Sequence, residues 1–198
     1  MTRKNRPRAP RPLNQLRIIG GDWRGRKLSF PDLPGLRPTP DRLRETLFNW
    51  LQPWVPGARC LDLFAGSGAL GLEALSRGAD HATFVEQAPA AAAQLRANLA
   101  LLGAQDCKVA AGSLPGWLQQ PPERPWDLVF LDPPYRQGLL SDCCALLESQ
   151  GYLATDAAIY LEAEQELGVP RVPSNWTLHR EKRAGQVASY LFLRGDAG

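Results

Sequence analysis

A glycine-rich turn between an apolar strand and an apolar helix is the feature that most constrains the fold of this chain. Residues 66–71 match the spacing G-x-G-x-x-G, and they follow the apolar segment 59–63. Glycine lets the backbone turn tightly and approach a ligand closely. Between a strand and a helix, this spacing is typical of a ligand-binding loop at the carboxyl end of a parallel strand. The turn therefore predicts an α/β chain.

The rest of the sequence repeats this alternation of strand and helix patterns. We expect strands at 16–21, 26–30, 59–63, 81–86, 108–111, 127–131, 157–162, 176–182 and 187–194. We expect helices at 40–51, 69–77, 89–102 and 139–150, with a short helix near Trp117. Thr39 is expected to cap the first of these helices. Alternating strands and helices predict a mostly parallel sheet covered on both faces, with an antiparallel pair at the end.

Composition excludes several classes of protein. The chain has 198 residues and is 44% hydrophobic, which fits one ordinary domain with a real core. No apolar stretch is long enough to span a bilayer, and we expect a cytoplasmic protein. The four cysteines form no C-x-x-C pair and there are only two histidines, so we expect free buried thiols and no metal site.

Charge is distributed unevenly along the chain. Residues 1–44 hold 12 Lys and Arg against 3 Asp and Glu, a net charge of +9. Residues 45–198 hold 11 against 17, a net charge of −6. A basic end on an acidic body is typical of an arm that contacts a polyanion. A disordered solubilising tail is the alternative.

Two acidic residues near the glycine turn discriminate between cofactors. Glu86 ends the next expected strand, where its carboxylate can accept two hydrogen bonds from a ribose diol. Asp62 stands four residues before Gly66 and would oppose the pyrophosphate that a dinucleotide places at a helix N-terminus. S-adenosylmethionine instead carries a sulfonium and an ammonium. Asp62 therefore favours this cofactor over NAD, which stays possible if Asp62 points away from the ligand.

The strand 127–131 ends in a rigid polar segment, Asp132-Pro133-Pro134-Tyr135. The two prolines fix the backbone, remove two N–H donors and leave the Pro133 carbonyl pointing outward. The exocyclic amine of a nucleic-acid base is conjugated to its ring, so it needs acceptors that hold its hydrogens. The Asp132 carboxylate and the Pro133 carbonyl can be those acceptors, while Tyr135 can stack on the base. This segment predicts methyl transfer to a base amine.

The glycine turn, Glu86 and the segment 132–135 together resemble the amino-directed class of Rossmann-like methyltransferases. Residues 20–26, 37–51 and 175–182 resemble the RsmD family of bacterial 16S rRNA guanine-N2 methyltransferases. The resemblance runs from about residue 16 to residue 194. It implies a class I methyltransferase fold with a seven-stranded, mostly parallel sheet whose last strand is inserted antiparallel. A β-hairpin and a helix precede that sheet.

The resemblance also implies roles for individual residues. Contacts to S-adenosylmethionine are implied for Asp62, Phe64, Ala65, Gly66, Gly68, Glu86, Gln87 and Ser113. Ser113 follows Gly112 where many methyltransferases have Asp or Asn near the adenine. Contacts to the target guanine are implied for Asp132, Pro133 and Tyr135. Phosphate contacts are expected from Arg24, Arg26, Lys27, Arg37, Arg42 and Arg44, and from the arm residues Arg3, Lys4, Arg6, Arg8 and Arg11. Trp23 can stack on RNA or pin the hairpin.

We therefore expect a flexible basic arm at 1–15, an RNA-binding extension at 16–56 and a methyltransferase domain at 57–198. The expected partner is 16S rRNA within an assembling small ribosomal subunit, and the expected state is a monomer. The motif also allows an N6-adenine or N4-cytosine methyltransferase of DNA, which would need a sizeable target-recognition domain. A nucleic-acid-binding protein with an inactive catalytic fold is a second alternative, and the intact Asp132, Tyr135 and Glu86 disfavour it.

Overall fold

The centre of the protein is a seven-stranded sheet. The computed structural model describes residues 13–36 and 39–195. The strand order is β5-β4-β3-β6-β7-β9-β8. These strands are β3 (Arg59–Asp62), β4 (His81–Glu86), β5 (Cys107–Ala111), β6 (Trp126–Leu131), β7 (Leu153–Glu164), β8 (Trp176–Ala184) and β9 (Val187–Arg194). β9 runs antiparallel to β7 and β8, while β3 to β7 pair in parallel. The predicted sheet with an inserted antiparallel last strand is confirmed.

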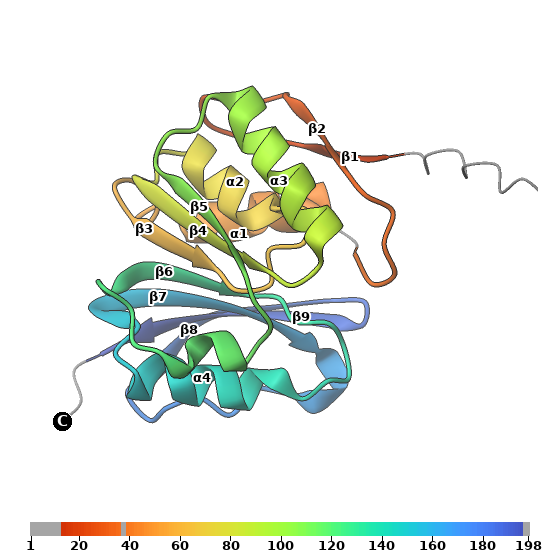
Figure 1. Cartoon of the computed structure of the whole chain (residues 1–198). Helices are drawn as coiled ribbons and strands as arrows, with labels where there is room; N and C mark the ends of the chain where they lie inside the picture. The colour runs from red at the N-terminus through yellow and green to blue at the C-terminus, as the bar shows by residue number, and fades with distance from the viewer. Residues whose placement is uncertain (1–12, 37–38, 196–198) are drawn as a thin grey trace, which may run out of the picture.

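Helices cover both faces of this sheet (Figure 1). One face carries α1 (Asp41–Trp50), α2 (Ala69–Ser76) and α3 (Pro89–Leu102), and the other carries α4 (Leu139–Ser149) and the 3-10 helix η1 (Gly116–Gln119). A second short 3-10 helix, η2 (Gln165–Leu167), follows β7. Side chains alternate across a strand, so Leu128 and Phe130 join the core under α1 to α3, while Val129 and Leu131 join the core under α4.

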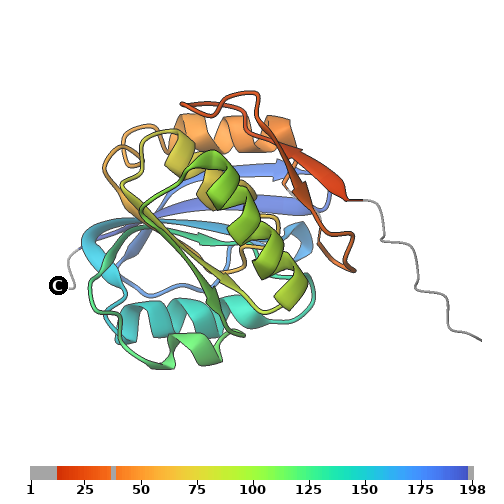
Figure 2. The same cartoon turned by 45° about the horizontal axis from the view of Figure 1, so that its top comes forward.

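The N-terminal hairpin packs on the body of the protein. β1 (Asn14–Arg17) and β2 (Lys27–Phe30) form an antiparallel pair beside α3, on the same side of the sheet as α1 (Figure 2). The side-chain amide of Asn98 on α3 donates a hydrogen bond to the Ser29 carbonyl, 2.8 Å away. Leu16 and Leu28 are buried in the core shared with α1 to α3. The hairpin and the glycine-turn half of the sheet thus share one core.

Several local predictions differ from the structure. The strand expected at 16–21 lies earlier, as β1 (Asn14–Arg17). α1 begins at Asp41 with Pro40 as its N-cap residue, and Thr39 makes no capping hydrogen bond, so the capping role predicted for Thr39 is wrong. The strand expected at 157–162 is longer at both ends, because β7 pairs with β6 at its start and with β9 at its end. A bulge between Trp126 and Leu128 accommodates the early part of this pairing.

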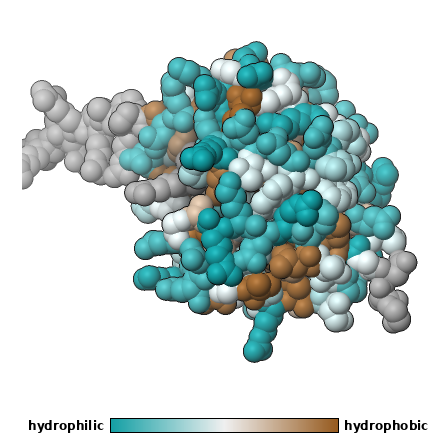
Figure 3. Space-filling model, turned by 180° about the vertical axis from the view of Figure 1, so that it is seen from behind, coloured by the Kyte–Doolittle hydropathy of each residue, from teal (hydrophilic) through white to brown (hydrophobic). Residues whose placement is uncertain are grey.

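The face of the molecule seen from behind is mostly hydrophilic, with one compact hydrophobic area (Figure 3). Among the described residues, no helix is long and apolar enough to cross a membrane. The four cysteines carry free thiols, and three of them are buried in the core. Burial raises the pKa of the Cys143 and Cys144 thiols to about 12, so these thiols stay protonated and packed as small apolar groups.

Candidate active site

The three glycines at positions 66, 68 and 71, in the turn after β3 and the first turn of α2, are each required by the local geometry. Gly66 and Gly68 have φ angles of +51° and +80°, in the left-handed region that favours glycine. A Cβ on Gly68 would lie 2.5 Å from the Leu95 side chain, and a Cβ on Gly71 would lie 2.3 Å from the Phe84 ring. The first two glycines therefore permit the turn, and Gly68 and Gly71 let α2 pack closely against α3 and the sheet.

Glu86 lies beside this turn at the end of β4. Its Oε2 accepts a hydrogen bond from the Gly66 N–H at 2.8 Å, and its Oε1 accepts one from the Ala88 N–H at 2.6 Å. Each carboxylate oxygen has a second lone pair that these bonds leave available. Two backbone donors thus fix the orientation of the carboxylate and leave lone pairs for further donors.

The other predicted cofactor residues surround Glu86. Ala65 is buried and donates its N–H to the Val85 carbonyl, 3.1 Å away, whereas Phe64 is half-buried and Gln87 is exposed. Ser113 is exposed just past the end of β5, the strand that pairs with β4. These side chains belong to the ends of neighbouring parallel strands, which accounts for their convergence.

Sequence reasoning did not find the role of Gly112, which precedes Ser113. A Cβ at this position would lie 2.6 Å from Cδ1 of the Trp117 ring. The Trp117 N–H donates to the Ser113 carbonyl at 3.0 Å, which holds the ring against the backbone. Packing of Trp117 therefore explains why a glycine stands there. The signal was a glycine at a strand end five residues before a bulky aromatic residue.

Asp62 is buried at the end of β3, behind the glycine turn. Its Oδ2 accepts a hydrogen bond from the Gly71 N–H at 3.1 Å, so it also holds the first turn of α2. Burial and the neighbouring Glu86 charge raise the pKa of this carboxyl to about 7, against backbone hydrogen bonds from Gly71 and Phe64 that lower it. A positive ligand group near Asp62 would stabilise its ionised form.

The negative charge near the glycine turn distinguishes between the two candidate cofactors, S-adenosylmethionine and NAD. The carboxyl groups of Asp62 and Glu86 both belong to this end of the sheet, and the Glu86 charge acts on Asp62. Negative groups suit the sulfonium and ammonium of S-adenosylmethionine and would repel a pyrophosphate. The residues present therefore fit S-adenosylmethionine. Within the described ranges, no group of three or more His, Cys, Asp and Glu side chains is placed to hold a metal ion.

The segment 132–135 follows β6, next to β3 in the sheet. Asp132 is partly buried, and burial raises its pKa well above the ordinary value, with the Glu162 and Asp62 charges adding to the rise. Tyr135 is 49% exposed, so its ring is accessible for stacking on a base. Burial and nearby carboxyl groups raise the Tyr135 pKa to about 12, which keeps its hydroxyl neutral.

The backbone that follows Tyr135 is held by the next strand. Arg136 has a φ angle of +61°, an uncommon conformation for a residue with a side chain. Its N–H donates a hydrogen bond to the Glu164 carboxylate at the end of β7. This contact fixes the turn that presents Tyr135.

Sequence reasoning also missed Glu162, which lies on β7 and is 4% exposed. Its Oε1 accepts hydrogen bonds from the Tyr160 hydroxyl at 2.7 Å and from the Thr39 hydroxyl at 3.3 Å. Its charge acts on Asp132. The available signal was one acid inside the apolar run of β7, because a buried charge in a central strand needs specific partners.

The basic residues predicted to contact RNA divide into three groups. Arg24, Arg26, Lys27 and Arg42 are exposed on the N-terminal extension, where they can reach a ligand. Arg37 and the arm residues Arg3, Lys4, Arg6, Arg8 and Arg11 lie outside the described residues. Arg44 is completely buried, so the phosphate contact predicted for Arg44 is wrong.

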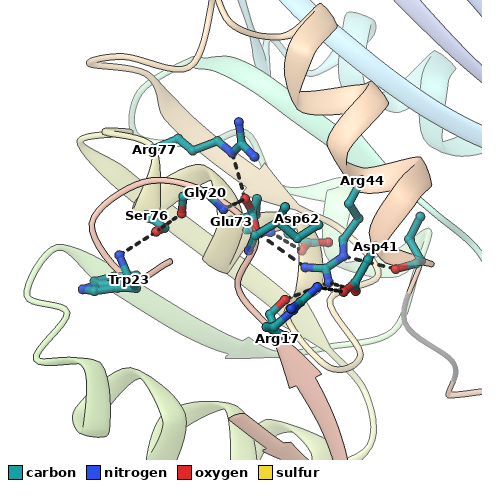
Figure 4. Close-up of polar contacts among 12 residues, drawn as sticks. Arg17, Gly20, Trp23, Asp41, Arg44, Asp62, Glu73, Ser76 and Arg77 are labelled. Carbon is teal, nitrogen blue, oxygen red and sulfur yellow. Dashed lines mark hydrogen bonds and ion pairs between the residues drawn. The ribbon is translucent and has the colours of Figure 1, made fainter. Parts of the chain in front are cut away.

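Arg44 instead connects α1 with α2 and β1 (Figure 4). Its guanidinium lies 3.5 Å from the Glu73 carboxylate and 2.6 Å from the Asp41 carboxylate. It also donates hydrogen bonds to the carbonyl groups of Thr39, at 3.1 Å, and Arg17, at 2.8 Å. A guanidinium has five donors in a fixed plane, which suits it to join several acceptors in a buried place.

Glu73 on α2 completes this connection. Its carboxylate accepts hydrogen bonds from the N–H groups of Ile19 and Gly20, at 2.9 and 2.7 Å, and from Arg77, at 2.8 Å. The backbone N–H of Trp23 donates to the Ser76 hydroxyl, 3.0 Å away, and the half-buried Trp23 ring packs against the core. Trp23 thus pins the hairpin to α2.

The inserted antiparallel strand, the glycine turn and the segment after β6 define a class I Rossmann-like methyltransferase fold with an amino-directed site. Residues 16–193 match the model of the family described as "Conserved hypothetical protein 95", and the chain belongs to that family. The resemblance to the RsmD family drawn from the sequence is confirmed.

Named relatives cover nearly the whole chain. This chain is 57% identical over 184 residues to "Ribosomal RNA small subunit methyltransferase D" of Escherichia coli strain K12. The match covers 93% of this chain and 92% of that protein. The Haemophilus influenzae protein of the same name is 45% identical over 186 residues, covering 92% and 96%. A solved structure, "Putative methyltransferase yhhF from Escherichia coli", superposes with a TM-score of 0.87 at 54% identity, covering 92% of this chain and 99% of that one.

Proposed function

We propose that this protein is an S-adenosylmethionine-dependent methyltransferase that modifies the exocyclic N2 amine of a guanine in 16S rRNA. The observation that carries the proposal is the placement of Asp132 and the exposed Tyr135 directly after β6, the strand that pairs with β3 beside the glycine turn. The 57% identical relative named for methylation of small-subunit ribosomal RNA supports the choice of substrate.

The residues that would hold the cofactor surround the glycine turn. The Glu86 carboxylate would bind the ribose hydroxyls, and Asp62 would attract the positively charged end. Phe64, Ala65, Gln87 and Ser113 would complete its surroundings at the ends of β3 to β5. When bound there, S-adenosylmethionine supplies a methyl group attached to a positively charged sulfur.

The residues after β6 would act on the guanine. The Pro133 carbonyl and the Asp132 carboxylate would accept hydrogen bonds from the amine, which fixes the direction of its lone pair. Stacking on Tyr135 is worth about 1–3 kcal/mol per base. Asp132 would take up the proton that the amine loses, and its raised pKa makes the ionised carboxylate a stronger base.

We further propose how the protein meets its substrate. The arm at 1–15 and the extension at 16–56 would hold the RNA, while residues 57–198 would carry out the chemistry. The protein would act as a monomer on an assembling small subunit in the cytoplasm. Light scattering of the purified protein during size-exclusion chromatography tests the monomeric state, since a dimer would have twice the 21.8 kDa mass of one chain.

Loss of the protein tests the activity directly. Ribosomal RNA from a strain that lacks it should lose one N2-methylguanosine, detected by mass spectrometry of nucleosides and of mapped fragments. The wild-type protein should restore the modification, and Asp132→Ala should turn over about 10²–10⁴-fold more slowly while still binding S-adenosylhomocysteine. Unchanged ribosomal RNA, with a methylated adenine or cytosine lost from DNA instead, would replace this proposal with a DNA methyltransferase.

A further inference from the structure

A buried acid on β7 has no part in the chemistry proposed so far. Glu162 is 4% exposed, and its Oε1 accepts the Tyr160 hydroxyl at 2.7 Å. The Tyr160 hydroxyl also lies 3.1 Å from the Ser189 hydroxyl on β9, so Ser189 can donate to Tyr160 while Tyr160 donates to Glu162. These bonds hold one oxygen of Glu162 in place. They do not neutralise its charge.

The second partner of Glu162 comes from the N-terminal extension. The Thr39 hydroxyl lies 3.3 Å from Glu162 Oε1, although the two residues are 123 positions apart. Asp132 lies beside Glu162 across the sheet, because the preceding residue on β6, Leu131, pairs with Leu161 on β7. The Thr39 hydroxyl also acts to lower the pKa of Asp132. A hydroxyl has one proton and can donate to only one carboxyl group at a time. The Thr39 hydroxyl can therefore donate to either carboxyl group, but not to both at once.

The groups that act on Asp132 come from each element packed around it. They are Asp62 from β3, Glu162 from β7 and Thr39 from the extension. The Asp132 and Glu162 charges in turn raise the pKa of the neighbouring Tyr135 and Tyr160 hydroxyls. Within the described part of the chain, none of these groups is a cation. Two like charges close together in a buried place disfavour joint ionisation, so each of the Asp132 and Glu162 carboxyl groups makes the other harder to ionise.

We propose that Glu162 and Thr39 are positioning residues for Asp132: Glu162 keeps Asp132 able to take up a proton, and Thr39 orients its carboxyl group toward the amine. This inference rests on the proposed function, because it assigns the surroundings of the carboxyl group that receives the amine proton. It also means that the N-terminal extension supplies part of the catalytic centre in addition to any contact with RNA.

Glu162→Gln in the full-length protein tests the first half of this proposal. The glutamine keeps an oxygen for Tyr160 and Thr39 but removes the charge. We expect the acidic limb of the pH profile of kcat to move toward lower pH by about one unit, with kcat at pH 8 falling about tenfold as Asp132 becomes a weaker base. The KM for S-adenosylmethionine should change less than about twofold, because the cofactor residues are untouched.

Thr39 allows a second, independent test. Thr39→Val keeps the shape of the side chain and removes the hydroxyl, so kcat should fall about tenfold. Thr39→Ser keeps the hydroxyl, so its kcat should be close to that of the wild type. If the two residues act through the same contact, the double variant Thr39→Val with Glu162→Gln should be slower than either single variant by much less than the product of their effects.

Ser189→Ala is the matched control, since it removes a buried hydroxyl from the far side of Tyr160 and should leave the acidic limb in place. The proposal is overturned if Glu162→Gln keeps the wild-type pH limb and a kcat within about twofold. If Glu162→Gln fails to fold, the comparison of Thr39→Val with Thr39→Ser decides: equal rates overturn the proposal. A wild-type protein that does not methylate 16S rRNA refutes the proposed function instead, so the two failures are distinguishable.

Discussion

Asp62 is a buried carboxyl group whose charge changes near neutral pH. Burial, followed by the Glu86 charge, raises its pKa to about 7. The ionised form attracts a cation and the neutral form does not, so cofactor binding should favour higher pH. We expect the affinity for S-adenosylmethionine to rise up to about tenfold between pH 6 and pH 8 and to level off above that, as measured by isothermal titration calorimetry.

Asp62→Asn provides the control for this pH dependence. The amide oxygen can still accept the Gly71 N–H, so α2 keeps its first turn, but binding should become nearly independent of pH. A raised carboxyl pKa also means that the free protein loses stability as pH rises from the ordinary value of 3.8 toward 7. Asp62→Asn should therefore raise the Tm of the free protein at pH 8 and leave it unchanged at pH 4. An equal pH slope of binding in both proteins would contradict the role of Asp62.

The position of a residue in the structure was predictable from the sequence where the end of a parallel strand determines that position. Asp62, Glu86 and Asp132 end neighbouring parallel strands, and such ends meet at one edge of the sheet. Thr39 and Arg44 were misplaced because their local patterns predicted a helix cap and a phosphate contact. Their actual partners, Glu162 and Glu73, lie on distant elements, and no local spacing in the sequence encodes those contacts.

Among the elements, α1 and α2 are joined by a buried ion pair whose removal should be costly. Arg44→Ala leaves the completely buried Glu73 carboxylate without one of its cations. Truncating one partner of a buried pair typically costs about 3–5 kcal/mol, and Glu73 keeps Arg77 and two backbone donors, so we expect the lower end of that range. Urea unfolding at pH 7 measures the loss.

Arg42→Ala is the matched variant on the same helix. Arg42 is exposed two residues before Arg44, so its removal should change the free energy of unfolding by less than about 0.5 kcal/mol. It should weaken RNA binding instead, in a filter-binding or fluorescence assay. Equal stability losses in the two variants would show that the extension is not anchored through Arg44.

The bounds of a helix were predictable from the sequence pattern, whereas the position of the last strand in the sheet was not. Hydrophobic periodicity places α3 at Pro89–Leu102, as predicted, because Gly103 ends the helix in a left-handed conformation. The insertion of β9 between β7 and β8 was predicted from the family resemblance alone. A closing hairpin can pair with a sheet through either of its strands, and the alternation of apolar residues does not distinguish the two.

At the scale of the whole molecule, the positive net charge of residues 1–44 contrasts with the negative net charge of residues 45–198, and the arm contributes much of the positive charge. Residues 1–12 hold five basic and no acidic residues. Each contact with a phosphate of single-stranded RNA adds about −0.7 to the slope of log affinity against log salt concentration. Deleting residues 1–12 should therefore reduce the steepness of that slope by up to about 3.5 and weaken binding at low salt.

The deletion needs a control that separates charge from chain length. Replacing Arg3, Lys4, Arg6, Arg8 and Arg11 with glutamine keeps the length of the arm and removes its charge. If the arm acts by neutralising phosphates, the two variants should have the same shallow salt dependence, and both should bind S-adenosylhomocysteine as the wild type does, because Asp62 and Glu86 are unchanged. A slope equal to that of the wild type in both variants would assign RNA binding to the folded extension, where Arg24, Lys27 and Arg42 are exposed.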